Sequence, residues 1–307
     1  MNKLLRIYIA VVLAMIFWSF SFIWFKVANE TFRPLTIVFI RLVLAVILLT
    51  FFIFLTGNYV KIKKGDKKLF FLLSVFEPFL YFLGESFGLT YVSATVGSVI
   101  ISTIPVIATL GAWLILRERL RVINYAGILI SFIGILVFVL SKEGGISFNI
   151  KGLGLLSIAV FSAVSYNLTL SKLIRSYSPV FIVYIQNIIG SLLFLPIFLI
   201  TEFHHLINTS FSFPDFLPII ELSVFASCGA FILFAWSVKN MGISRANVFT
   251  NFIPVFTAFF SFIILGDKLS LQNIGGMVIV ITGIFLSQIN GRQKSIDNAL
   301  TLTGKTA

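Results

Sequence analysis

Residues 95–106, TVGSVIISTIPV, have a counterpart 149 residues further along the chain, at residues 244–255, SRANVFTNFIPV. Both stretches end in Ile-Pro-Val, and both place small polar residues at their first, fourth and eighth positions. Side chains three and seven positions apart lie on one face of an α-helix. The two stretches therefore predict a pair of related helices. Each would carry a polar stripe that ends at a proline, which cannot donate a backbone hydrogen bond.

The same offset of 149 residues extends the match without a gap. The aligned residues are Ser74 with Ser223, Glu118-Arg119-Leu120 with Asp267-Lys268-Leu269, Asn124 with Asn273, Gly127 with Gly276, and Gly134 with Gly283. Apolar helices resemble one another by composition alone, but Pro, Asn and Gly rarely coincide at one constant offset. The chain is therefore predicted to contain two homologous halves, at residues 7–140 and 152–289, followed by a polar cytoplasmic tail at residues 290–307.

The composition requires a solvent other than water. The chain is 59% hydrophobic and 11% charged, whereas a soluble domain has about 45–50% apolar and about 25% charged residues. An apolar run of about 20 residues crosses a bilayer as a helix. Such runs lie at residues 7–28, 34–55, 69–91, 95–116, 122–140, 152–171, 180–200, 216–238, 246–265 and 271–289. The predicted fold class is an all-α integral membrane protein with ten transmembrane helices.

Each predicted half has five spans, which is an odd number. The second half must therefore cross the membrane in the opposite direction to the first, so the two halves form an inverted repeat. Inverted repeats are typical of secondary transporters, in which a site between two pseudo-symmetric halves opens alternately to either side of the membrane. This arrangement is the main functional prediction from the sequence.

The basic residues predict the orientation. With the N-terminus inside, 17 lysines and arginines fall in inner segments and 5 in outer ones, and Arg41 remains within a span. Cytoplasmic loops carry an excess of Lys and Arg, so both termini are predicted to be cytoplasmic. The net charge of +12 is explained by these short loops, and no nucleic-acid partner is predicted.

Ionisable residues within spans are the first candidates for a site, because a charge in hydrocarbon needs a partner or a wet cavity. Arg41 and Glu85 lie at similar depth from the outer ends of their spans. In one hypothesis, Glu85 carries a coupling proton or contacts a cationic substrate group, and Arg41 receives a carboxylate. In the alternative, the two residues form a fixed structural ion pair. Glu77 precedes the kinking Pro78, and either lines the cavity or extends toward the inner surface.

The polar stripes are the second set of candidates. Thr95, Ser98 and Ser102 face one way on one helix, and Asn247 and Asn251 occupy aligned positions on the other. These residues would line a central pathway, or they would join helices by hydrogen bonds. Further candidates for the cavity wall are Trp18, Tyr81, Tyr166 and Asn167. For the aromatic residues, the alternative is a packing or interfacial role. The glycines of the fifth and tenth spans are expected to let two helices pack closely.

No cofactor, metal site or catalytic residue is predicted. The chain has one cysteine, Cys228, and its two histidines, His204 and His205, lie in a polar loop. A zinc site needs more ligands in fixed geometry, and no phosphate-binding loop is present that would bind ATP. The predicted partners are a small-molecule substrate, the lipid bilayer and, as an open alternative, protons. A membrane-embedded enzyme and a channel or receptor are the competing functions, and the oligomeric state is left open.

The chain resembles the drug/metabolite transporter superfamily with paired EamA-type repeats. The resemblance covers about residues 7–289. It depends on Phe17-Trp18-Ser19, Arg41, residues 88–95 (GLTYVSAT), Pro105, and Glu118-Arg119-Leu120 followed by Gly127 and Gly134. It implies a ten-helix alternating-access carrier without ATP, in a prokaryotic inner membrane, often exporting amino acids or related metabolites. The second half departs from the pattern, because Gln186 stands near the position where Arg41 would repeat and Asp267-Lys268 replaces Glu-Arg.

Overall fold

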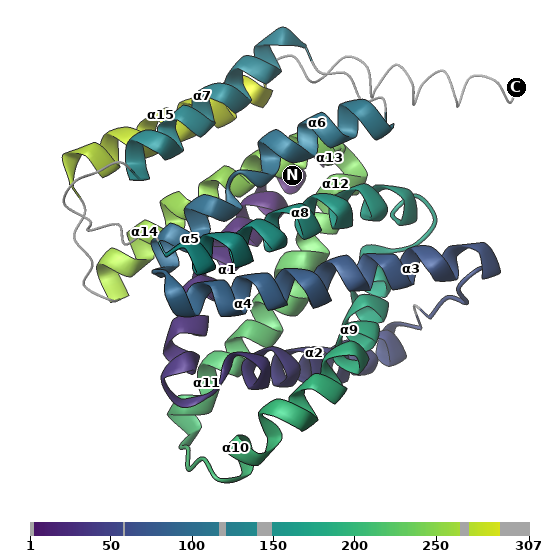
Figure 1. Cartoon of the computed structure of the whole chain (residues 1–307). Coiled ribbons are helices and arrows are strands. Elements are labelled where there is room, and N and C mark those ends of the chain that lie inside the picture. Colours follow the sequence, from purple (N-terminus) through teal and green to yellow (C-terminus); the bar gives the residue numbers. More distant parts are fainter. Residues whose placement is uncertain (1–2, 58, 117–120, 140–148, 265–269, 289–307) are drawn as a thin grey trace, which may run out of the picture.

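The computed structural model describes residues 3–57, 59–116, 121–139, 149–264 and 270–288. Within these ranges the chain is helical apart from short connections (Figure 1). The Glu118-Arg119-Leu120 motif, its counterpart at Asp267-Lys268-Leu269 and the tail at residues 290–307 lie outside the described residues.

The first half follows the apolar runs of the sequence, with two interruptions. Its helices are α1 (Lys3–Thr31), α2 (Pro34–Thr56), α3 (Lys67–Ser74), α4 (Tyr81–Tyr91), α5 (Ala94–Ile101), α6 (Ile104–Leu116) and α7 (Val122–Val139). A short 3₁₀ turn, Lys64–Asp66, precedes α3, and a wide π-type turn, Val75–Leu80, joins α3 to α4. The third span therefore consists of α3 and α4, and the fourth of α5 and α6.

The second half has the same plan. Its helices are α8 (Ile150–Leu173), α9 (Pro179–Thr201), α10 (Phe203–Ile207), α11 (Phe213–Glu221), α12 (Phe231–Met241), α13 (Ile243–Val248), α14 (Phe252–Ile264) and α15 (Leu271–Gln288). A π-type turn, Leu222–Ala230, joins α11 to α12, and a 3₁₀ turn, Phe249–Asn251, joins α13 to α14. Within the described residues, seven helical segments are long and apolar enough to cross a membrane. The interrupted α5–α6 segment and the shorter α7 and α15 complete the ten predicted spans.

Proline and cap residues explain where the helices begin and break. Pro34 and Pro179 begin α2 and α9, where the missing N–H costs nothing because the first turn has no intrahelical acceptor for it. Asn149 caps α8 by accepting from the backbone N–H of Lys151 at 3.0 Å. Pro105 and Pro254 each follow a break in the fourth span of their half, because a proline cannot continue the hydrogen-bond ladder of the turn before it.

Equivalent helices of the two halves pack antiparallel. On α2 and α9, Phe39 stacks on Phe198 with ring centroids 4.6 Å apart, and Thr50 donates to the hydroxyl of Tyr184 at 3.3 Å. Residue numbers rise along one helix as they fall along the other. The helices α7 and α15 lie side by side in the same way (Figure 1), because Gly127 meets the backbone of Ser287 and Gly134 meets that of Val280. The halves therefore form an inverted repeat, as the span count predicts.

Further contacts cross between the halves. Gly84 and Gly88 of α4 pack against Ala159 and Leu156 of α8. The symmetry-related contact joins α1 to the turn between α11 and α12, where Phe17 packs on Phe225 with ring centroids 5.2 Å apart. The third span of each half therefore lies against the first span of the other. The two halves interlock rather than standing beside each other as separate domains.

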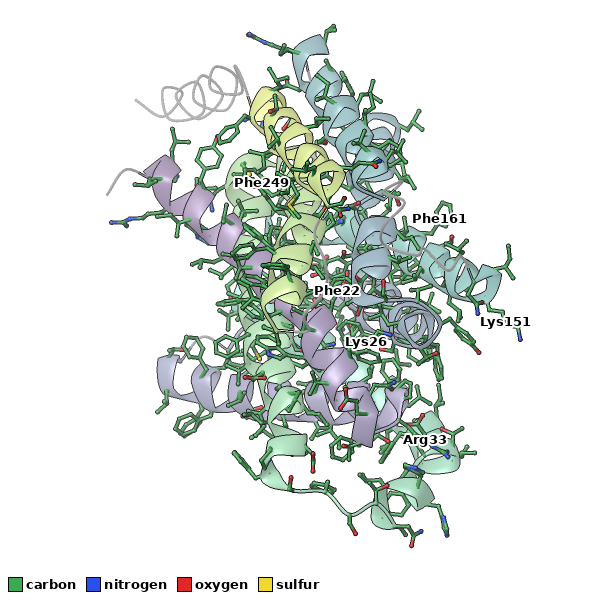
Figure 2. The ribbon with its side chains drawn as sticks, turned by 90° about the vertical axis from the view of Figure 1, so that its left-hand side faces the viewer. Phe22, Lys26, Arg33, Lys151, Phe161 and Phe249 are labelled. Atoms are coloured by element: carbon green, nitrogen blue, oxygen red, sulfur yellow. The ribbon has the colours of Figure 1, made fainter. Side chains whose placement is uncertain are left out.

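The outer surface of the bundle is apolar. Ile47, Phe51 and Phe54 of α2 are 59%, 66% and 85% exposed, and hydrocarbon side chains project outward from the helices in Figure 2. Lipid is the solvent that suits such a surface. Lys26, one turn beyond Phe22 on α1, donates instead to the backbone carbonyl of Leu89 at the end of α4, where a cation meets the negative end of a helix dipole.

Candidate functional site

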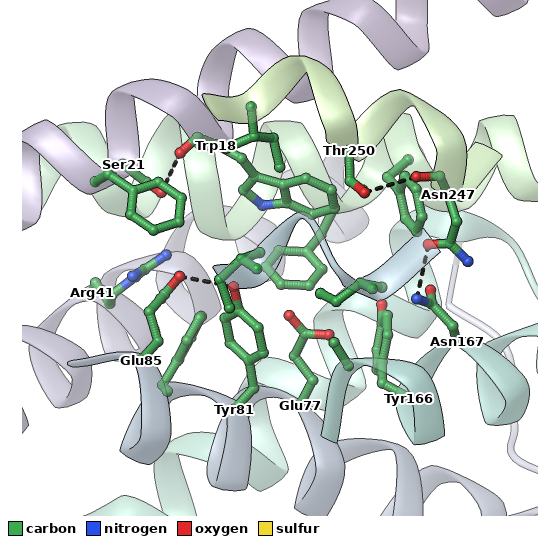
Figure 3. A pocket seen from close by; sticks show the side chains of 18 residues that line it. Trp18, Ser21, Arg41, Glu77, Tyr81, Glu85, Tyr166, Asn167, Asn247 and Thr250 are labelled. Carbon is green, nitrogen blue, oxygen red and sulfur yellow. Dashed lines mark hydrogen bonds between the residues drawn. The ribbon is translucent and has the colours of Figure 1, made fainter. Parts of the chain in front are cut away.

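An internal cavity lies between the two halves (Figure 3). Its charged and polar lining comes from the first three spans of the first half and from α8, α13 and the turn after α13: Trp18, Ser21, Arg41, Glu77, Tyr81, Glu85, Tyr166, Asn167, Asn247 and Thr250. Its apolar lining is Phe22, Phe82, Ile101, Ile104, Ala163, Phe231, Phe234 and Ile253. Both halves are therefore needed to build one site.

The cavity is narrow in this conformation. The centre of a water-sized sphere can reach only about 40 Å³ of the space between its walls. One water needs roughly 10–15 Å³ on this measure. The space as it stands therefore holds a few waters, and a metabolite requires the helices to separate.

Arg41 is the cation of the cavity wall, and its guanidinium is held in place from two sides. Its Nε donates to Ser227 Oγ at 2.9 Å, and its central carbon lies 4.3 Å from the centroid of the Phe82 ring. Arg41 is 2% exposed. Within the described residues, the structure gives it no ion pair with a carboxylate, so the guanidinium is positioned by a hydroxyl and an aromatic face.

Glu85 lies beside Arg41 in Figure 3 and has one close donor of its own. The hydroxyl of Tyr81, one turn earlier on α4, donates to Glu85 Oε1 at 2.8 Å. The spacing of four residues places both side chains on the same face of the helix. Arg41 and Glu85 line the same cavity. Their roles, as a structural pair or as a binding site, stay predictions.

Glu77 reaches the cavity through a break in the helix. Its backbone has φ −147° and ψ 119°, an extended conformation between α3 and α4, and Pro78 follows it. Such interruptions at membrane depth occur where the backbone lines a cavity or is buried in protein. The side chain is 6% exposed, and its carboxylate points into the cavity in Figure 3.

The opposite wall is made of amides and a phenol. Asn167 Nδ2 donates to Asn247 Oδ1 at 3.0 Å, and the hydroxyl of Tyr166 donates to Gln186 Oε1 at 3.1 Å. Two buried atoms of the asparagine pair, Asn167 Oδ1 and Asn247 Nδ2, have no hydrogen-bond partner among the residues that the structure describes. The second half therefore contributes neutral hydrogen-bonding groups to a cavity whose charges come from the first half.

The sequence candidates divide into two groups. Those that line the cavity are Trp18, Arg41, Glu77, Tyr81, Glu85, Tyr166, Asn167 and Asn247. Ser98 and Ser102 are buried but are not part of this lining. Asn251 also lies outside it and donates to Ser131 Oγ of α7 at 2.5 Å, a contact that joins helices. The side chain of Thr95 lies outside what the structure describes.

Several residues of the site carry no clear signal in the sequence. Ser227, which holds Arg41, is one of many serines in apolar spans, and Phe231 and Phe234 are two of 36 phenylalanines. Ser21 and Thr250 offer a weak signal, because each lies three residues from a candidate, Trp18 and Asn247 respectively. Among the described residues, no group of three or more His, Cys, Asp or Glu side chains is arranged to hold a metal ion.

A helical membrane protein built from two inverted halves, with a cavity lined by residues of both halves, has the architecture of a transporter. The chain belongs to the EamA-like transporter family, whose model matches residues 5–140 and again residues 150–289. Family membership and fold both indicate that the chain is a membrane-spanning transporter with a duplicated domain.

The relatives support this family. An uncharacterized transporter of Archaeoglobus fulgidus is 27% identical over 282 residues, which cover 91% of this chain and 97% of the relative. The uncharacterized transporter YcxC of Bacillus subtilis is 26% identical over 296 residues, which cover 94% of each protein. One solved crystal structure superposes with a TM-score of 0.77 over 92% of this chain and 96% of that chain. Its sequence identity is 14%, so that likeness concerns the fold alone.

Proposed function

We propose that this protein is a secondary transporter that moves small metabolites by alternating access, without ATP. The observation that supports this most strongly is the position of the cavity between two inverted halves, with lining residues from both. Charged groups in hydrocarbon are costly and mark substrate or ion pathways. The narrowness of the cavity fits a carrier that must change shape around its cargo rather than a permanently open pore.

The chemistry of the cavity favours amino acids or related compounds. The Arg41 guanidinium offers planar, charged donors that suit a carboxylate. Glu85 lies beside it and offers an acceptor for an ammonium group. Trp18 meets Phe231 edge to face, with ring centroids 5.2 Å apart, and these rings provide an apolar wall for a side chain. A zwitterion with an adjacent apolar group satisfies all three features.

The direction of transport is proposed to be export across a prokaryotic inner membrane, with both termini in the cytoplasm. Lysine and arginine are in excess in the segments that lie on the same side of the membrane as the N-terminus, and this excess supports cytoplasmic termini. Coupling to protons is proposed as the energy source. No catalytic step, cofactor or metal ion forms part of this proposal.

Flux into proteoliposomes tests the function. Purified protein is first screened for thermal stabilisation by a panel of amino acids, since a ligand that binds the folded state raises its apparent stability. We expect saturable counterflow of the stabilising compound in vesicles loaded with the same compound. Chemical conversion of the compound would favour the membrane enzyme. Non-saturable flux without counterflow would favour the channel.

A further inference from the structure

The two carboxylates of the cavity are held very differently. Glu85 accepts a hydrogen bond from Tyr81 at 2.8 Å and lies beside Arg41. Glu77 receives no hydrogen bond from any group in the described part of the chain, although it is 6% exposed. In Figure 3, Tyr81 stands between the two carboxylates. Glu77 is therefore the acid of the cavity whose charge the surrounding protein does little to stabilise.

The internal repeat shows that the fold does not need an acid at this place. The residues 149 positions after Glu77 and Pro78 are Ala226 and Ser227, and they lie in the equivalent π-type turn, Leu222–Ala230. That turn forms with an alanine where the first half has Glu77. The acid is therefore present in only one of two equivalent turns. Wide turns of this kind are frequent at functional sites.

The groups that face Glu77 leave one negative charge without compensation. Arg41 of α2 is the cation, and Tyr81 and Glu85 of α4 and Tyr166 of α8 are the other titratable groups of the lining. The hydroxyl of Tyr166 donates to the neutral amide of Gln186 on α9. One guanidinium cannot neutralise two carboxylates. An unpaired ion in a low-dielectric interior costs several kcal/mol, and a bound proton removes that cost.

We propose that Glu77 is the residue that carries the coupling proton. Its carboxylate takes up a proton from one side of the membrane to become a neutral carboxylic acid, and the acid releases the same proton to the other side after the halves have moved. Glu85 stays ionised beside Arg41 throughout the cycle. This assignment rests on the proposed function of proton-coupled transport, and it places the proton on a different residue from the substrate.

Infrared spectroscopy of the protein in liposomes tests the proton site without any substrate. Difference spectra between alkaline and neutral buffer, in both of which exposed carboxylates stay ionised, are recorded for the wild type, Glu77→Gln and the matched control Glu85→Gln. We expect a carbonyl band of a protonated carboxyl group in the wild type and in Glu85→Gln, and its loss in Glu77→Gln. A band that survives unchanged in Glu77→Gln, or that disappears only in Glu85→Gln, overturns the proposal.

Glu77→Asp serves as the second variant, because it keeps a carboxyl group if Glu77→Gln does not reconstitute. Its band must shift in frequency relative to that of the wild type, and an unshifted band assigns the signal to another acid. A flux assay separates this inference from the proposed function. We expect Glu77→Gln to keep counterflow and to lose uptake driven by a pH gradient. Gradient-driven uptake that persists in this variant contradicts the inference alone, whereas a wild type without counterflow contradicts the function itself.

Discussion

At the scale of single residues, the site depends on how one buried guanidinium is oriented. Ser227 accepts a hydrogen bond from Arg41 Nε at 2.9 Å. The serine comes from the second half, 186 residues away in sequence. The central carbon of the guanidinium lies over the Phe82 ring, 4.3 Å from its centroid, and the remaining N–H groups are the donors that a carboxylate would meet. Ser227 therefore links the conformation of the second half to the charge contributed by the first.

Ser227→Ala is expected to destabilise the protein by about 1–3 kcal/mol, because it leaves a buried donor of Arg41 without its acceptor. It should also weaken carboxylate binding. Ser223→Ala is the matched control: Ser223 lies one turn earlier, is equally buried, and its Oγ has no hydrogen-bond partner in the described part of the chain. Thermal unfolding in detergent measures both variants. Equal losses would mean that the contact to Arg41 contributes nothing specific.

The hydrogen bond from Tyr81 to Glu85 should contribute more than the similar bond on the opposite wall. Hydrogen bonds to a charged acceptor contribute about 1.5–3 kcal/mol, and neutral ones about 0.5–1.5 kcal/mol. We expect Tyr81→Phe to lower stability more than Tyr166→Phe, which loses its bond to the amide of Gln186. Unfolding temperatures of the two variants decide the matter. The opposite order would indicate that Glu85 is not ionised in the resting protein.

The sequence predicted the ionisable part of this site better than its surroundings. Arg41, Glu77 and Glu85 stand out because a charge inside an apolar run is rare and costly. Ser227 and Phe231 do not, since serine and phenylalanine are ordinary residues of a membrane helix. Asn251 shows the opposite problem: it continues the polar stripe of Asn247, yet it bonds to Ser131. Spacing along one helix defines a face but not what that face meets.

At the scale of elements, the turn between α3 and α4 packs against α9. A methyl group at Gly190 would overlap the Pro78 ring, so this glycine leaves room for the residue that follows Glu77. Gly190→Ala is expected to cost about 1–3 kcal/mol through overpacking and to disturb transport by displacing the turn. Gly154→Ala has no neighbour within 4 Å of its new methyl group, so it should instead stabilise the protein by about 0.5–1 kcal/mol.

Unfolding temperature and counterflow of both glycine variants test this packing. A Gly190→Ala protein as stable and as active as Gly154→Ala would show that the turn can move freely on α9. The sequence predicts a kink at Pro78, because proline interrupts a helix. It does not predict the glycine that makes room for the kink, because Gly190 lies more than 100 positions away and no local sequence pattern connects the two residues.

At the scale of the whole molecule, the inverted repeat was predictable because it requires only an offset and an odd number of spans. The interlocking of the halves was not predictable in this way. Span lengths do not show that α4 packs on α8, or that α1 packs on the turn between α11 and α12. These contacts depend on the shapes of glycines and aromatic rings that meet only in three dimensions.

Hydrogen bonds join segments of the two halves at both ends of the bundle. At the end near residues 61–68, the hydroxyl of Tyr177 donates to Asp66 Oδ2 at 2.8 Å and accepts from the backbone N–H of Lys63 at 3.0 Å. At the other end, Glu202 Oε2 accepts from the backbone N–H and the hydroxyl of Thr36 at 2.7 and 2.8 Å. Burial raises the pKa of Tyr177 above its usual value. Its hydroxyl therefore remains a donor at neutral pH, and the contact is lost only as the pH rises through that raised pKa.

Alternating access requires each end to open in turn, so a covalent link at either end should stop transport without abolishing binding. Cysteine pairs at residues 36 and 202, and at residues 66 and 177, are placed in a Cys228→Ser background and joined with a short, reducible thiol cross-linker. We expect flux to cease in both cases and to return on reduction, while thermal stabilisation by the substrate persists.

The control is a pair at residues 124 and 287, where Asn124 Nδ2 donates to the Ser287 carbonyl at 2.6 Å. This pair links α7 to α15. Because these two helices pack on each other through glycines as one scaffold, that link should leave flux unchanged. Continued flux with both ends linked would contradict the alternating movement of the halves, whatever the cavity binds.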